Sequence, residues 1–104
     1  MPAVARKNGK DSVASPDGTG VGCGSPTTQA TDAGSSDVFI NGVGAVRQGD
    51  AMRTHSGPGC VPHAPKLATF SGSVFVNGKG IGRKDDGYNG HIISSGSPNV
   101  FAGG

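Results

Sequence analysis

The sequence predicts an all-β domain built from three short hairpins, and two observations lead to this prediction. An apolar stretch that ends in Asn-Gly occurs at 38–42 and again at 74–78, and a truncated copy stands at 99–103. Asn-Gly supplies the positive φ angles of a tight hairpin turn. In addition, 20 Gly and 7 Pro interrupt the 104 residues, and each Gly costs about 1 kcal/mol in a helix interior. We therefore expect residues 1–104 to form one domain without helices.

Taken in order, residues 3–6 resemble the second strand of a hairpin, and residues 12–34 resemble a long connection without strand or helix periodicity. The two complete repeats at 38–50 and 74–86 share seven residues at a constant offset. The last apolar residues, at 99–101, resemble a first strand. The chain ends should then meet as a third hairpin, and the apolar faces of all three hairpins should converge on a common axis.

The remaining apolar and charged residues have simpler interpretations. Met52, Leu67 and Tyr88 are expected to fill a small core. The repeated pairs Arg47–Asp50 and Arg83–Asp86 are expected to form ion pairs in a solvated rim, where such pairs contribute about 0–1 kcal/mol.

Composition excludes several classes of function. The formal net charge is +2 and the basic residues are scattered, which argues against a nucleic-acid surface. No apolar run approaches the roughly 20 residues of a membrane span. The first residues lack a secretory signal, so we expect synthesis in the cytoplasm. Because hydrophobic residues make up only 33%, the core is thin, and such domains usually need a metal, disulfides or a partner.

All histidines and cysteines fall in the connections between the hairpins: Cys23, His55, Cys60, His63 and His91. If three hairpins surround one axis, these connections meet at one end of it. Zinc prefers four ligands from Cys and His in a structural site. Three alternatives stay open, namely ordinary solvated loop residues, a nucleophilic Cys/His pair, and a Cys23–Cys60 disulfide in place of metal ligation.

Two motifs resemble the hallmarks of PAAR-repeat proteins. Residues 34–42 read Gly-Ser-x-x-Val-Phe-x-Asn-Gly, and 96–101 repeat the phrase as far as Val-Phe. Residues 2–6 and 45–50 resemble the Pro-Ala-Ala-Arg-x-Gly-Asp element of that family. The likeness covers nearly the whole chain. It departs after Arg6, where the chain is two residues longer than expected, and at 72–74, where Gly-Ser-Val is one residue shorter than the parent phrase.

The resemblance implies a small cone of three β-hairpin repeats with threefold pseudo-symmetry and a metal-stabilised apex. It implies one zinc ion, with iron as the alternative metal, held by three His and one Cys. The implied ligands are His55, His63, His91 and Cys23, with Cys60 as the alternative cysteine.

The resemblance also implies a structural role without catalysis. The domain would cap the trimeric β-helical spike of a type VI secretion system or a contractile phage tail, one copy per trimer. It would sharpen the spike for puncture of a target membrane, which it meets transiently when contraction drives it outward. Nucleic acid and small-molecule substrates are not expected, nor is a fused toxin domain after Gly104. The expected spike-binding residues lie in the three hairpins: Val38, Phe39, Ile40, Val74, Phe75, Val76, Val100 and Phe101. A small zinc-dependent hydrolase that uses the Cys/His site is the alternative function.

Overall fold

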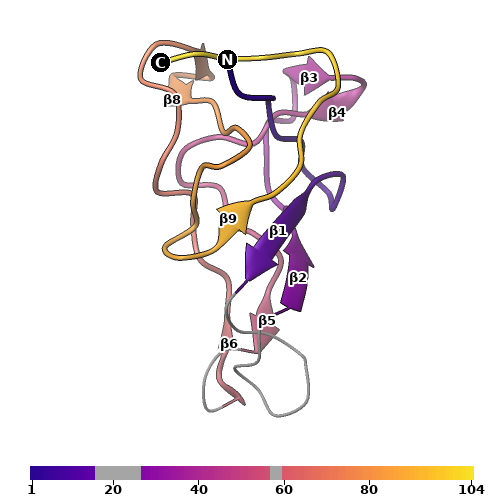
Figure 1. Ribbon diagram of the computed structural model, residues 1–104, viewed down its shortest axis with the longest axis vertical. Coiled ribbons are helices and arrows are strands. Elements are labelled where there is room, and N and C mark those ends of the chain that lie inside the picture. Colours follow the sequence, from indigo (N-terminus) through magenta and orange to yellow (C-terminus); the bar gives the residue numbers. More distant parts are fainter. Residues whose placement is uncertain (16–26, 57–59) are drawn as a thin grey trace.

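The computed structural model describes residues 1–15, 27–56 and 60–104, and these contain short strands and no α-helix (Figure 1). The all-β prediction is confirmed at this level. The strands are β1 (Ser12–Ser15), β2 (Thr27–Ala30), β3 (Phe39–Ile40), β4 (Val43–Gly44), β5 (His55–Ser56), β6 (Pro62–His63), β7 (Phe75–Val76), β8 (Lys79–Gly80) and β9 (Ile92–Ile93). The principal extents are 38 × 23 × 23 Å. Within the described residues, no helix is long and apolar enough to span a membrane.

The two hairpins predicted from Asn-Gly are present. β3 pairs with β4 and β7 pairs with β8, both antiparallel. The two turn residues have positive φ angles in each hairpin, 53° and 80° at Asn41-Gly42 and 54° and 76° at Asn77-Gly78. These angles are those of a type I′ turn, whose twist matches that of the flanking strands.

The two chain ends also pair with each other, as the sequence predicts. Ala3 forms an antiparallel bridge with Phe101, and the amide of Val4 donates to the carbonyl of Val100 at 2.9 Å. The N- and C-termini lie side by side at one end of the molecule, near β3, β4 and β8 (Figure 1). We call this end, with its hairpins, the base.

A serine hydroxyl accepts the same kind of hydrogen bond at three places, namely in the two hairpins and at the paired chain ends. The hydroxyl of Ser35 accepts the amide of Val38 at 2.9 Å. Matching bonds of 2.9 and 3.0 Å join Ser71 to Val74 and Ser97 to Val100. The expectation that the second copy is one residue short at 72–74 is therefore wrong. Ser71 takes the place of Ser35, so the two copies align without a gap.

The prediction that residues 12–34 form only a connection is wrong at both of its ends. β1 and β2 pair antiparallel, and β9 pairs with the other edge of β1, giving a three-stranded sheet in the order β2-β1-β9. This sheet lies between the base and the β5–β6 hairpin (Figure 1). β1 and β2 are rich in Ser and Thr with little apolar alternation, so tertiary pairing holds them. Residues 16–26 lie outside the described part of the chain.

Two small apolar clusters form the core. The first lies under the base hairpins and contains Val4, Ile40, Ala45, Val76, Ile81 and Ala102. The second packs around Tyr88 and contains Ala5, Val13, Val46, Met52, Leu67 and Ile93. Met52 and Tyr88 are fully buried and Leu67 is 3% exposed, so the expectation that these three fill the core is confirmed.

The phenylalanines of the hairpins face outward, which differs from the expected convergence of all apolar side chains on one axis. Phe39 and Phe75 are each 58% exposed and Phe101 is 49% exposed. Their neighbours Ile40 and Val76 are buried. Successive side chains of a strand point to opposite faces, so one residue of each pair must leave the core.

Candidate metal centre

A cross-strand pair positions the first two histidines. His55 begins β5 and His63 ends β6, and the two residues are direct partners in this antiparallel pair. Directly opposed residues project to the same face of a sheet. Their Nε2 atoms lie 2.9 Å apart and their ring centroids 4.4 Å apart. A spacing of eight residues in the sequence thus becomes a contact through the hairpin.

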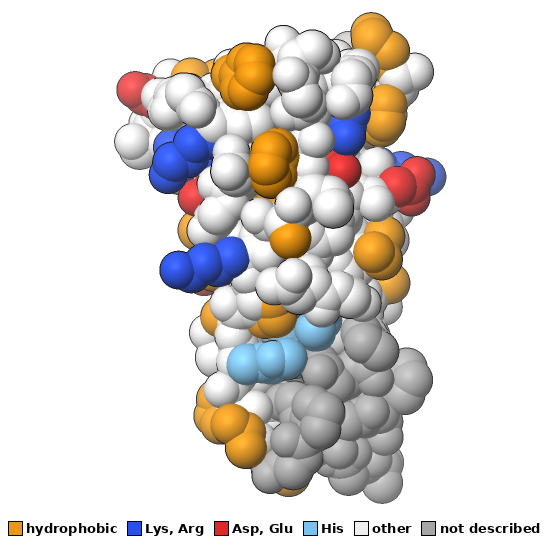
Figure 2. Space-filling model, turned by 90° about the vertical axis from the view of Figure 1, so that its left-hand side faces the viewer, with side chains coloured by type: hydrophobic (Ala, Val, Ile, Leu, Met, Phe, Trp, Pro, Cys, Tyr) orange, Lys and Arg blue, Asp and Glu red, His pale blue; other side chains and the backbone are white. Residues whose placement is uncertain are grey.

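His91 completes the cluster from the segment just before β9. Its Nε2 lies 3.2 Å from Nε2 of His55, and its ring centroid is 5.3 Å from that of His63. One ring nitrogen from each of the three residues lies within 4.8 Å of the others. His55 and His91 are buried, whereas His63 is half-buried. Pale-blue histidine side chains reach the surface in the lower half of the space-filling view (Figure 2).

Backbone carbonyls set the orientation of two of the rings. Nδ1 of His55 lies 3.0 Å from the carbonyl oxygen of Arg53, and Nδ1 of His91 lies 3.0 Å from that of Tyr88. A carbonyl oxygen can only accept, so each Nδ1 carries the proton and each Nε2 keeps a lone pair. Metal-ligating histidines typically have this outer hydrogen bond.

In neutral rings, Nε2 of His55 and Nε2 of His91 are both acceptors and lie 3.2 Å apart, an arrangement that a bound cation would stabilise. Zinc–nitrogen distances of about 2.0–2.1 Å in a tetrahedron place neighbouring nitrogens about 3.3 Å apart. The observed separations of 2.9 and 3.2 Å are close to that value. The donor set and its geometry therefore fit a metal ion such as zinc.

Among the described residues, no cysteine belongs to this histidine cluster. Cys60 is exposed, has a positive φ of 62° and is disulfide-bonded. The chain has one other cysteine, Cys23, which lies outside the described residues, as does its predicted role as a ligand. Cys60 therefore forms a disulfide, which is one of the alternatives that the sequence left open.

Three Arg–Asp ion pairs, each with a buried aspartate, occur in the described part of the chain. The Nε of Arg47 donates to Asp50 at 2.9 Å, and that of Arg83 donates to Asp86 at 2.9 Å. The predicted ion pairs are confirmed, but the expected solvated rim is wrong, since Asp50 and Asp86 are buried.

The third pair, Arg6–Asp11, was missed because the chain is two residues longer there. It is the most buried of the three, with side chains 9% and 1% exposed. Burial alone raises the pKa of Asp11, but hydrogen bonds from Arg6 and Ser95 outweigh it and hold that pKa below its usual value. The hydrogen bond to Asp11 raises the pKa of Arg6.

Each arginine also reaches the next turn of the base. Nη1 of Arg6 donates to the side-chain oxygen of Asn41 at 3.3 Å, and that of Arg47 donates to Asn77 at 3.0 Å. At the third place, Arg83 donates to the carbonyl oxygen of Gly103 at 3.1 Å. The sequence-based expectations did not include this use of the Asn side chains, although both complete repeats carry an Asn and an Arg at matching positions.

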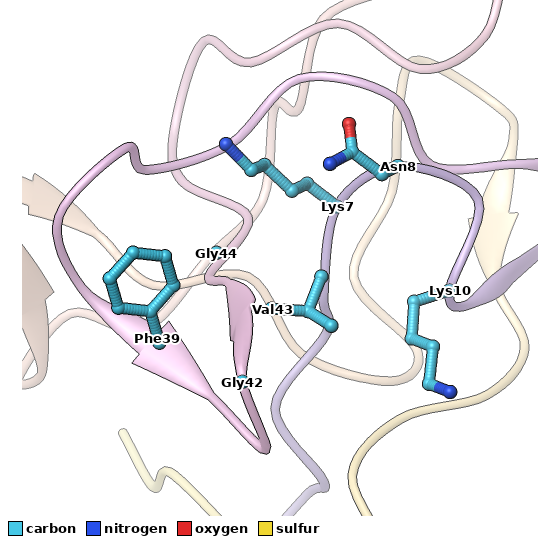
Figure 3. A pocket seen from close by; sticks show the side chains of 7 residues that line it. All are labelled: Lys7, Asn8, Lys10, Phe39, Gly42, Val43 and Gly44. Atoms are coloured by element: carbon cyan, nitrogen blue, oxygen red, sulfur yellow. The ribbon is translucent and has the colours of Figure 1, made fainter.

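A hollow of about 360 Å³ opens beside the β3–β4 hairpin (Figure 3). Lys7, Asn8 and Lys10 line one side of it, while Phe39 and Val43 line the other. Within the described residues, neither lysine forms an ion pair with a carboxylate. The aliphatic part of Lys7 lies against Gly44, where an added Cβ would come within 2.7 Å of it.

Comparison with known proteins adds no assignment. No protein-family model matches the chain, and no curated protein is significantly similar to it.

Proposed function

We propose that this protein is a structural spike tip, a small cone with threefold pseudo-symmetry whose base caps a trimeric β-helical spike. The observation that carries the proposal is the recurrence of one set of contacts at three places around the base. Each place has a serine hydroxyl holding a valine amide. Each also has an arginine that binds its own aspartate and donates to a neighbouring segment of the base, to an asparagine side chain at two places and to the carbonyl oxygen of Gly103 at the third. A single chain with three similar faces suits a partner with three identical ones, so one copy binds per trimer.

The base offers that partner an apolar surface. Phe39, Phe75 and Phe101, one from each place, are each about half exposed or more at the end where the termini lie. Large exposed apolar side chains commonly mark interaction sites, and aromatic residues often dominate interface energies. The short hairpins also carry strand edges that the last coil of a β-helix can extend by backbone hydrogen bonds.

The opposite end is proposed to hold one zinc ion through His55, His63 and His91. A structural zinc supplies folding free energy where few apolar residues fit. The chain contributes the orientation of the rings, through the carbonyls of Arg53 and Tyr88. A tip closed in this way would resist unfolding when contraction of a sheath drives the spike through a membrane.

The fourth ligand links zinc binding to the state of the cysteines. Zinc binds thiolates, and a sulfur in a disulfide has no thiolate to offer. Ligation by Cys23 or Cys60 therefore requires the disulfide of Cys60 to be reduced. Counting free thiols in the zinc-loaded protein, under reducing and oxidising conditions, identifies which form binds the metal.

Binding to a purified trimeric β-helical spike tests the main proposal. Mass measurement of the complex should give one chain per trimer. Phe39→Asp, Phe75→Asp and Phe101→Asp should each weaken binding by about 30-fold, corresponding to the roughly 2 kcal/mol of an interface hot spot. Val61→Asp is the matched control, because Val61 is 63% exposed and lies next to β6, away from the base.

Equal weakening by Val61→Asp would contradict the proposed binding face. Failure of the native chain to bind the spikes encoded beside it in its genome would overturn the spike-tip role itself.

A zinc hydrolase is the second candidate, because three histidines are also the protein ligands of some catalytic zinc sites. A catalytic site keeps a fourth position for water, whereas a structural site fills it with a protein ligand. X-ray absorption of the zinc-loaded protein separates the two, since a sulfur ligand and full protein coordination would exclude the hydrolase.

A further inference from the structure

Four Asn-Gly dipeptides form turns with the same backbone conformation in this chain. Asn8, Asn41, Asn77 and Asn89 have φ angles of 59°, 53°, 54° and 51°, and the glycine that follows each has a positive φ as well. The four dipeptides therefore share both their local sequence and their left-handed backbone. They differ only in what surrounds them.

Asn-Gly is the dipeptide most prone to spontaneous deamidation, because glycine has no side chain to hinder the reaction. The backbone nitrogen of the glycine loses its proton and attacks Cγ of the asparagine. A bond from this nitrogen to Cγ forms, the bond from Cγ to Nδ2 breaks, and ammonia leaves. Solvent water then opens the cyclic imide to aspartate or isoaspartate. The asparagine side chain and the glycine nitrogen must both be free to move.

Hydrogen bonds hold the side chains of Asn41 and Asn77. Oδ1 of Asn41 accepts from Ser97 at 2.6 Å and from Arg6 at 3.3 Å, and its Nδ2 donates to Asn99 at 2.8 Å. Asn77 is held by three similar bonds, of 2.8, 3.0 and 2.9 Å, to Ser35, Arg47 and Asp37. Attack on either Cγ requires these bonds to break first.

At Asn8 the attacking nitrogen is held instead. The amide of Gly9 donates to the carbonyl oxygen of Thr31 at 2.7 Å. The side chain of Asn8 is exposed and makes no hydrogen bond with the described residues. In this turn the attacking nitrogen of Gly9 is held by a hydrogen bond, whereas the carboxamide of Asn8 is free to move.

Asn89 has neither protection. Its side chain is exposed, and within the described part of the chain neither its carboxamide nor the amide of Gly90 has a hydrogen-bond partner. We infer that Asn89–Gly90 is a spontaneous modification site, where the native protein deamidates in preference to its three other Asn-Gly turns.

The position of this turn gives the modification a consequence for the metal centre. Tyr88 and His91 flank Asn89-Gly90, and the amide of Tyr88 donates to the carbonyl oxygen of His91 at 2.6 Å. Nδ1 of His91 faces the carbonyl oxygens of Tyr88 and Asn89 at 3.0 and 3.4 Å. Isoaspartate at position 89 lengthens the backbone of the turn by one carbon, which displaces the groups that orient the His91 ring. This consequence, unlike the modification itself, rests on the proposed zinc site.

Peptide mapping by mass spectrometry tests the modification. The native full-length protein is incubated in neutral and mildly alkaline buffer, with unfolded protein in parallel, and all four sites are quantified over time. We expect similar rates at the four sites in the unfolded chain. In the native protein, the rate at Asn41 and Asn77 should be at least about tenfold below that at Asn89, a factor that corresponds to about 1.4 kcal/mol of barrier. Asn8 should lie between them.

The inference is overturned if native Asn89 is modified no faster than Asn41 or Asn77.

Chelator competition tests the consequence separately. Aged protein should release zinc several-fold faster than fresh protein, and aged Asn89→Gln should behave like fresh protein, because glutamine would have to form a larger ring. Asn89→Asp adds the charge without the extra backbone carbon, so it should release zinc more slowly than aged protein. Equal release from fresh and aged protein would refute the effect on His91. If fresh protein binds no zinc, the proposed metal site fails while the order of modification stands.

Discussion

The Nε2 atoms of His55 and His63 lie 2.9 Å apart across the β5–β6 hairpin. With His91 beside them, they form a donor set whose ligand atoms lie within 4.8 Å of one another. A cation bound by these nitrogens would hold the three rings together. The stability of this end of the fold should therefore depend on metal.

Removal of zinc should lower the melting temperature. At free zinc 100 times its dissociation constant, binding adds about 2.7 kcal/mol to the free energy of unfolding. For a domain of this size, that corresponds to a shift of about 10–20 °C. Thermal unfolding with and without a chelator measures the shift.

The His55→Ala variant should abolish the effect of the chelator on the melting temperature. Thr54→Ala serves as its control, since Thr54 is an exposed neighbour outside the cluster. A chelator shift that persists in His55→Ala would show that the metal binds elsewhere.

The Asp11→Asn substitution should destabilise the fold by about 3 kcal/mol. It leaves the buried guanidinium of Arg6 without its charged partner, and breaking a buried ion pair costs about 3–5 kcal/mol. Asp32→Asn makes the same chemical change at an exposed carboxylate and should change stability by less than about 0.5 kcal/mol. Denaturant unfolding of both variants measures the difference. Equal midpoints would mean that the Arg6–Asp11 pair contributes nothing net.

Acid should destabilise the protein partly through Asp11. The pKa of Asp11 is lower in the folded protein than its usual value of 3.8, so its stabilising contribution is fully present above about pH 4. This contribution is lost as the pH falls from there through the folded pKa. Unfolding free energies of wild type and Asp11→Asn, measured across this range, should converge. A constant difference between them down to low pH would contradict the lowered pKa.

Tyr88→Phe should stabilise the fold or leave it unchanged. The Tyr88 side chain is fully buried, and its hydroxyl has no hydrogen-bond partner within the described residues. Burial, together with the nearby carboxylates of Asp50 and Asp11, raises its pKa. An unsatisfied buried polar group costs about 1–3 kcal/mol, so its removal should raise the free energy of unfolding by about 1 kcal/mol. A clear loss of stability on calorimetry would instead reveal a bound partner for the hydroxyl, such as an ordered water.

The sequence by itself determined the elements whose signals are local. Asn41-Gly42 and Asn77-Gly78 fix type I′ turns through their own φ preferences. The constant offset of the copies, and the truncated copy at the C-terminus, led to the pairing of Ala3 with Phe101. The grouping of three histidines followed from their position in the connections. These predictions succeed because local backbone preferences and repeated motifs can be recognised from the residues themselves, without knowledge of tertiary contacts.

The tertiary structure alone decided which side chains meet. β1 and β2 form without an apolar pattern, because pairing with each other and with β9 holds them. The side chain of Phe39 is exposed because the core packs against the other face of its strand. Asn41 and Asn89 have the same local sequence and backbone, yet only Asn41 is held by Ser97 and Arg6. Contacts between residues distant in the chain depend on register and packing, which short-range preferences do not encode.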